Sequence, residues 1–144
     1  MSSDNLIANA QIQINATVDT VWDAFVNPAI IKQYMFGTTV TSDWEKGSSI
    51  TWKGEMDGKT YEDKGEILEI IPQQKLKYTH FSPSEGTADS KENYHTVTVT
   101  LHPDKDQTEV KLSQDKNATE KARESSEKNW NMMLESLKKL LEKG

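Results

Sequence analysis

The feature that most constrains the fold is a long apolar stripe near the C-terminus. Apolar and small residues recur there at three- and four-residue intervals, the spacing of one face of an α-helix: Ala122, Ser126, Trp130, Met133, Leu134, Leu137, Leu140 and Leu141. Asn117 followed by Glu120 resembles a capping box at the start of this helix. A helix of about 25 residues spans roughly 37 Å, so its continuous apolar face must be buried against another layer of the protein.

The chain ahead of this helix is patterned mainly as strands. Alternation of apolar and polar residues predicts a first strand over residues 8–16 and about six further strands between residues 38 and 114. Two short helices separate these regions, the first capped by Thr17 and the second opened by Pro28 and ended near Gly37. We therefore predict an α+β fold, in which a curved antiparallel sheet of about six to seven strands wraps around the C-terminal helix.

Turn signals divide the predicted sheet. Asp57-Gly58 favours a two-residue type I′ turn between strands 49–56 and 59–71. The surrounding residues 54–60 look like a phosphate-binding loop, but they have three residues between the glycines where that motif needs four. Apolar residues at 67–71 occupy both faces of their strand and suggest a β-bulge. The longest loop, residues 82–93, is the predicted mobile lid.

Length and composition restrict the class of protein. The 144 residues suit a single domain over residues 1–144, and the absence of cysteine excludes disulfides and thiolate zinc sites. A net charge of −6, with one arginine, disfavours nucleic acid and anion-specific sites. No apolar run reaches the ~20 residues of a membrane helix and no signal segment opens the chain, so we expect a cytoplasmic protein without membrane insertion. No cofactor is expected.

Two histidines are predicted to face each other across neighbouring strands. His95 has the parity of the aliphatic residues that follow it, so it lies on the buried face of its strand. Antiparallel pairing with the strand at 75–81 keeps lysines and threonines off this face. The register predicts three cross-strand pairs: Leu76 with Val99, Tyr78 with Val97, and His80 with His95.

The histidines allow more than one interpretation. Each can be a core residue whose hydrogen bonds are satisfied by a carbonyl, a hydroxyl or water, or a polar anchor for a ligand at the mouth of a cavity. A metal site is disfavoured because the pair lacks a third ligand at a persuasive spacing, and Glu69 or Asp63 would have to supply it. His102 has the opposite parity and is predicted to lie at an exposed strand end.

The chain as a whole resembles a known superfamily. The blocks INATVDTVWDAFVNPAIIKQYMFG, SDWEKGSSITWKGEMDGKTYEDKGEILEIIPQQKLKYT, ENYHTVTVTL and EKNWNMMLESLKKLL resemble the SRPBCC (START-like) superfamily. Within it, they are similar to stand-alone bacterial relatives of the C-terminal domain of the activator of the ninety-kilodalton heat-shock-protein ATPase. The resemblance covers about residues 8–141 and implies a helix-grip fold with a hydrophobic cavity between the long helix and the sheet. Gly47-Ser48 stands where many relatives have two glycines, and the eukaryotic activator's N-terminal domain has no counterpart here.

Three functions follow from these observations. The leading hypothesis is binding of a small apolar or amphipathic molecule, by a monomer or weak dimer, with no metal. The second is a protein-interaction module that stimulates a chaperone ATPase, as the resemblance implies. The third is an acid-base enzyme of cyclase or hydrolase type that uses His80, His95 and Tyr78. The predicted ligand-binding residues are Trp52, Tyr61, Tyr78, His80, His95, Val97, Val99, Trp130, Met133 and Leu137.

Overall fold

The computed structural model describes residues 6–35, 37–56, 58–82, 94–117 and 119–143. The elements follow one another as β1 (Leu6–Ile14), α1 (Val18–Val26), α2 (Pro28–Tyr34), β2 (Thr39–Ser42), β3 (Ser49–Met56), β4 (Lys59–Ile71), β5 (Lys75–His80), β6 (His95–Asp104), β7 (Gln107–Asn117) and α3 (Glu120–Lys143).

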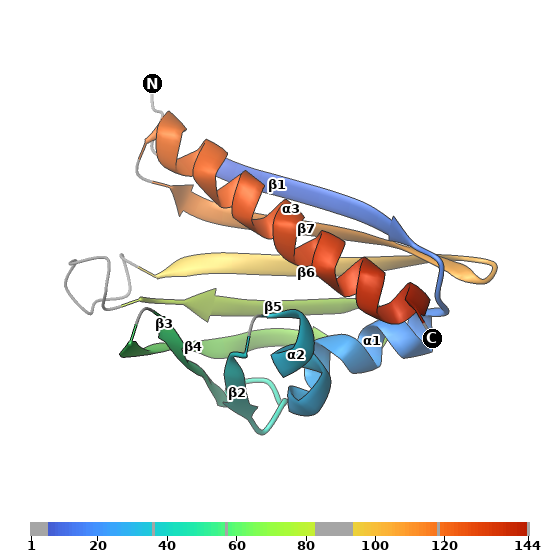
Figure 1. Ribbon diagram of the computed structural model, residues 1–144, viewed down its shortest axis with the longest axis horizontal. Helices are drawn as coiled ribbons and strands as arrows, with labels where there is room; N and C mark the ends of the chain where they lie inside the picture. Colours follow the sequence, from blue (N-terminus) through green and yellow to red (C-terminus); the bar gives the residue numbers. More distant parts are fainter. Residues whose placement is uncertain (1–5, 36, 57, 83–93, 118, 144) are drawn as a thin grey trace.

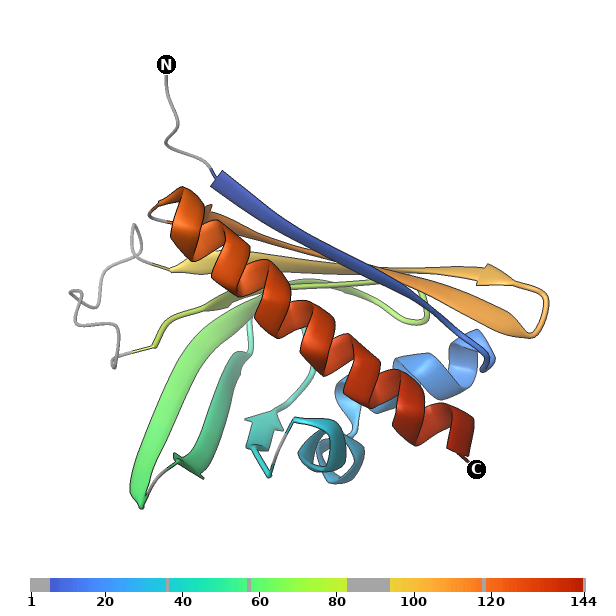
Figure 2. The ribbon, with the colours of Figure 1, turned by 45° about the horizontal axis from the view of Figure 1, so that its top comes forward.

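The strands form a seven-stranded antiparallel sheet in the order β1-β7-β6-β5-β4-β3-β2. Helix α3 lies diagonally across one face of this sheet, and α1 and α2 lie near its C-terminal end (Figures 1 and 2). The predicted α+β helix-grip fold is therefore confirmed. No helix in the described part of the chain has both the length and the apolar character needed to cross a membrane.

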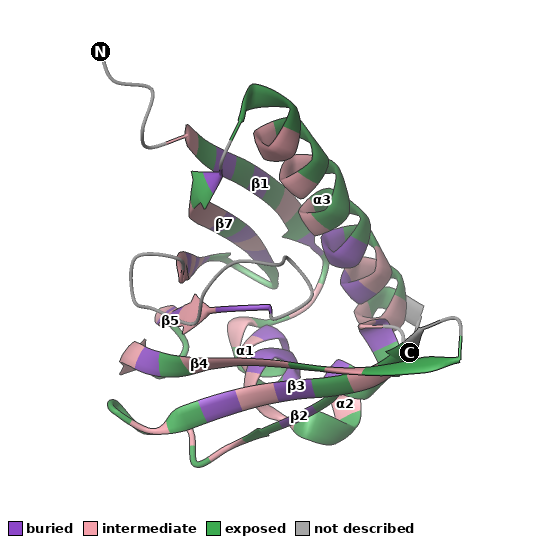
Figure 3. Cartoon of the chain, turned by 90° about the vertical axis from the view of Figure 1, so that its left-hand side faces the viewer, coloured by how far each residue is buried: buried purple, intermediate pink, exposed green. Residues whose placement is uncertain are grey.

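The core lies between α3 and the concave face of the sheet. Met133, Leu134 and Leu137 of the predicted stripe are buried, whereas Met132, on the other side of the helix, is 50% exposed. Figure 3 shows buried bands on α3 and on the strands that face it. Each fully buried leucine stabilises the fold by about 1.5–3 kcal/mol relative to an exposed one, so this contact holds the helix on the sheet.

The predicted register of β5 and β6 is confirmed. Leu76 pairs with Val99, Tyr78 with Val97, and His80 with His95. The pairing of β4 with β5 shifts between Ile67 and Glu69, where the sequence suggests a bulge. His102 is exposed, as its parity predicts.

The predicted capping box at Asn117 is wrong by two residues. Asn117 ends β7, where its buried amide donates to the carbonyl oxygen of Leu6 at 2.9 Å. The cap of α3 is instead Thr119, whose Oγ1 accepts a hydrogen bond from the backbone N–H of Ala122 at 3.0 Å. Because the side chain of Asn117 is bonded to β1, the hydroxyl of Thr119 caps the helix.

Other boundaries differ by a few residues. The first strand ends at Ile14, not at residue 16, and the last strand continues to Asn117. Thr17 holds the N-cap position of α1 but makes no capping hydrogen bond with its side chain. The predicted turn residue Asp57 and most of the predicted lid lie outside the described residues, while Gly58 has the positive φ that such a turn requires.

Helix α3 also covers the free edge of β1. Glu127 accepts a hydrogen bond from the backbone N–H of Asn9 at 3.0 Å, and Glu142 accepts one from the N–H of Asn15 at 2.7 Å. The Asn9 N–H lowers the pKa of Glu127, and Lys138 together with the Asn15 N–H lowers the pKa of Glu142. Because edge strands otherwise offer unpaired backbone groups to other chains, these carboxylates both fix the helix and protect the edge.

Strand β4 passes from pairing with β3 to pairing with β5 between residues 64 and 67. Its first half pairs with β3 and its second half with β5, and the bridge between Lys64 and Phe81 marks the crossover. A Cβ atom at Gly65 would overlap the carbonyl oxygen of Thr79. This close approach of two backbones bends the sheet around the helix and requires a glycine.

We predict that Gly65→Ala destabilises the protein by about 2–4 kcal/mol, because the methyl group meets backbone that must shift. Glu66→Ala, at the next and exposed position of the same strand, should change stability by less than about 0.5 kcal/mol. Urea denaturation measures both. Equal stability of the two variants would show that the bend tolerates a side chain.

Candidate functional site

The candidate site lies between α3 and the concave face of the sheet, around Trp130. Trp130 is only partly buried, and its indole Nε1 donates to Oε1 of Gln114 on β7 at 2.6 Å. Met133, one helical turn further, is buried. The indole is thus held in a fixed orientation beside space that the core does not fill.

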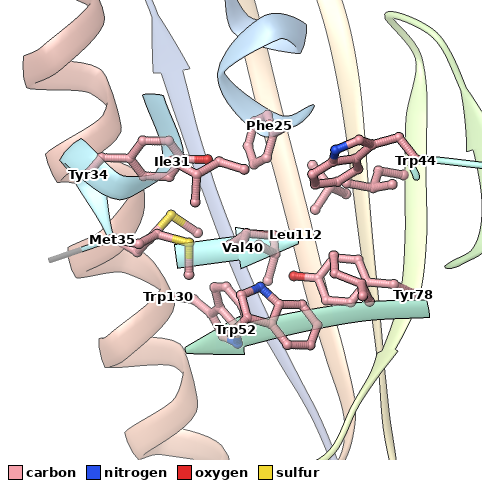
Figure 4. Close-up of a pocket in the computed structure, with 14 residues that line it drawn as sticks. Phe25, Ile31, Tyr34, Met35, Val40, Trp44, Trp52, Tyr78, Leu112 and Trp130 are labelled. Carbon is pink, nitrogen blue, oxygen red and sulfur yellow. The ribbon is translucent and has the colours of Figure 1, made fainter. Parts of the chain in front are cut away.

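Three adjoining cavities occupy this space, and Met35 and Trp130 line all of them. The deep cavity has a volume of about 30 Å³, the middle one about 100 Å³ and the outer one about 320 Å³. The deep cavity, shown in Figure 4, is walled mainly by apolar side chains from α1, α2 and the sheet, including Phe25, Ile31, Tyr34, Val40, Ile50, Leu76 and Val99. The outer cavity is large enough for a small organic molecule.

Aromatic side chains form the wall between the deep and middle cavities. The ring of Trp52 lies 5.3 Å from that of Tyr78 and 4.9 Å from that of His80. Tyr61 lies across Gly54, its cross-strand partner, where a Cβ atom would overlap the phenol ring. The glycine that resembled part of a phosphate loop therefore makes room for an aromatic side chain.

The hydroxyl of Tyr78 is the most unusual polar group of the site. Tyr78 is 8% exposed, lines both inner cavities, and its hydroxyl points in among the lining side chains (Figure 4). Within the described part of the chain, this hydroxyl makes no hydrogen bond, and its oxygen is open to the cavity. Burial raises its pKa well above the ordinary value, so the group stays neutral and can donate or accept a hydrogen bond.

Tyr34 provides a contrast. It is also buried, but its hydroxyl donates to the carbonyl oxygen of Ala24 at 2.7 Å and so ties α2 to α1. Burial, and to a lesser degree the neighbouring Tyr78, raises its pKa. One buried tyrosine is structural, while the other presents its hydroxyl to a cavity.

The two paired histidines have different surroundings. His80 lines the middle cavity, and its Nε2–H donates to Oδ2 of Asp63 at 3.0 Å. His95 lies 6.4 Å away, ring to ring, and its Nδ1–H donates to the backbone carbonyl of Asp115 at 2.9 Å. The His80 and Asp63 pair can orient a bound molecule or exchange a proton with it, whereas His95 is engaged with the neighbouring strand.

Most of the predicted site residues meet at these cavities. Trp52, Tyr61, Tyr78, His80, Val99, Trp130 and Met133 line at least one of the three. His95, Val97 and Leu137 do not line them, and the last two are completely buried in the core.

Sequence reasoning missed several lining residues. Gln114 has the parity of Val110 and Leu112 on β7, so strand alternation alone could have placed it inside. Met35 was predicted as an apolar member of the second helix, but α2 ends at Tyr34 and not near Gly37, so Met35 caps the helix and lines the cavities. Thr38 lies in the connection to β2, where no periodic pattern indicates its position. Ser126 and Asn129 lie at the outer cavity on α3.

No three histidine, aspartate or glutamate side chains gather in a metal-binding arrangement among the residues that the structure describes. Asp63 and His80 form a pair without a third such group.

Solved structures with the same fold were found. The protein ChR145 from Cytophaga hutchinsonii is 58% identical, with a TM-score of 0.85 and coverage of 96% of this chain and 94% of that one. The Aha1 dimer from Colwellia psychrerythraea is 19% identical, with a TM-score of 0.71 and coverage of 94% and 95%. DynU16, from the dynemicin biosynthetic locus, is 17% identical, with a TM-score of 0.80 and coverage of 95% and 47%.

Sequence comparison gives a family. No curated protein matches this chain significantly. A family profile described as "Activator of Hsp90 ATPase homolog 1-like protein" matches residues 15–142. That match covers the two short helices, α3 and every strand after β1. The chain therefore belongs to the Activator of Hsp90 ATPase homolog 1-like family.

Proposed function

We propose that this protein, as a monomer or weak dimer, binds a small amphipathic molecule in the cavities beneath α3. The observation that carries the proposal is the hydroxyl of Tyr78, which is open to the cavity and makes no hydrogen bond to the described residues although the residue as a whole is buried. A ligand that bonds to this hydroxyl gains the net value of one hydrogen bond, about 0.5–1.5 kcal/mol.

The cavity lining suits a molecule with an apolar body. Trp52, Trp130 and Tyr61 offer flat apolar faces, and Met35 and Met133 offer flexible thioethers that adapt to different shapes. The outer volume of about 320 Å³ falls within the range of small-molecule sites.

Binding is favoured over acid-base catalysis. The raised pKa of Tyr78 makes its phenolate rare at neutral pH. His95 is bonded to the carbonyl of Asp115 and lies outside the three cavities. Of the three groups considered for a proton shuttle, His80 alone combines an ionisable ring with a place on the cavity wall.

The first test blocks the outer cavity. Asn129→Phe puts a ring at its mouth from an exposed helix position, and Asn131→Phe places the same ring at another exposed position of α3. We expect the neutral dye Nile red, displaceable by 1-decanol, to bind the parent protein and Asn131→Phe with affinities within twofold. Asn129→Phe should bind at least tenfold more weakly, as measured by dye fluorescence. Equal binding to both variants, or none to the parent, would contradict the proposal.

The second test compares the two buried tyrosines. Tyr34→Phe should lower the free energy of unfolding by about 1–3 kcal/mol, because the carbonyl of Ala24 loses its donor, whereas Tyr78→Phe should leave it nearly unchanged. Tyr78→Phe should also weaken 1-decanol binding about three- to tenfold, the value of one hydrogen bond. Urea denaturation and calorimetric titration measure these effects. A Tyr78→Phe variant as unstable as Tyr34→Phe would assign Tyr78 a purely structural role.

A second candidate function is stimulation of a chaperone ATPase, which the family match favours. It would use the surface of the protein, so Tyr78→Phe should stimulate as well as the parent does. The expected result is a rise in the ATPase rate of the Hsp90-type chaperone from the same organism when the protein is added in excess. An unchanged rate would rule out this function.

A further inference from the structure

We propose that the cavity selects amphipathic organic cations, such as alkylamines, over carboxylates of the same chain length. This inference rests on the proposed ligand binding and adds the charge of the head group. It follows from the charged and aromatic side chains that line the middle and outer cavities.

The charged lining is acidic. Asp63 lines the middle cavity and Glu55 the outer one, and no lysine or arginine is among the described residues that line the three cavities. Strand alternation keeps the lysine of β3 out of the cavities, because Lys53 is exposed on the face opposite to Trp52. An anionic head group would therefore enter without a cationic partner, at a cost in desolvation.

Asp63 is well placed to meet a cation. Its side chain is 18% exposed, so it is screened from water more strongly than a surface carboxylate. His80 bonds to one of its oxygens. An ionised carboxylate accepts about four hydrogen bonds, so Asp63 keeps acceptor capacity for an ammonium group.

The aromatic side chains favour the same charge. Asp63 shares the middle cavity with Trp52, Tyr61, Tyr78 and Trp130. Ring faces attract cations, most strongly where water is excluded. The free hydroxyl of Tyr78 can also accept a hydrogen bond from an ammonium group, so its unpaired state fits this ligand class.

The test compares three ligands with the same ten-carbon chain: decylamine, 1-decanol and decanoate. Each ligand is titrated against bound Nile red at pH 8.5 in 0.15 M salt. At this pH ordinary imidazoles are neutral, and the salt screens the attraction between a charged ligand and the protein surface. We expect decylamine to bind at least tenfold more tightly than decanoate, with 1-decanol between them. Binding of decanoate as tight as that of decylamine would overturn the inference.

Two variants distinguish the effect of the cavity carboxylate on binding from the effect of the overall negative charge of the protein. Asp63→Asn keeps an acceptor for His80 and should reduce the affinity for decylamine at least threefold, with little effect on 1-decanol. Glu62→Gln removes the same charge from the exposed, opposite face of β4 and should leave both affinities unchanged. An equal loss in the two variants would attribute the preference to surface charge and overturn the inference.

The outcomes also separate this inference from the proposed function. If 1-decanol binds and decylamine binds no better, the cavity takes ligands without the proposed charge selection, and this inference alone fails. If none of the three ligands displaces the dye, the proposed function fails and the inference with it.

Discussion

The structure depends on the burial of one face of α3 against the concave sheet. Met133, Leu134 and Leu137 supply the contact, and Glu127 and Glu142 fix the helix to the edge of β1 through backbone N–H groups. The Gly65 bend carries β3 and the first half of β4 around the helix.

The space beneath the helix is the proposed binding site. Trp130 is bonded to Gln114 and packs against the core at the edge of the cavities, and Tyr78 presents an unbonded hydroxyl to the cavity. The chain belongs to the Activator of Hsp90 ATPase homolog 1-like family. Because a fold does not determine a ligand, the proposed binding rests on the residues that line the cavities of this chain.

Much of the fold could be predicted because strand parity and helix periodicity are local. The pairing of His80 with His95 followed from which side chains can be buried together. The different hydrogen-bond partners of the two histidines could not be predicted. His80 bonds to Asp63 of β4 and His95 bonds to the carbonyl of Asp115 on β7, and both partners are distant in sequence. Asn117 was misread for a similar reason, since its partner Leu6 is distant in sequence.

The central claim is that the space beneath α3 admits a ligand. Methyl NMR of ¹³C-labelled methionines tests it directly, because Met35 and Met133 line the cavities while the adjacent Met132 is exposed on the outside of the helix. On titration with 1-decanol, the Met35 and Met133 methyl signals should shift together with saturation, and that of Met132 should stay in place. Shifts confined to Met132, or none at Met35 and Met133, would contradict the claim.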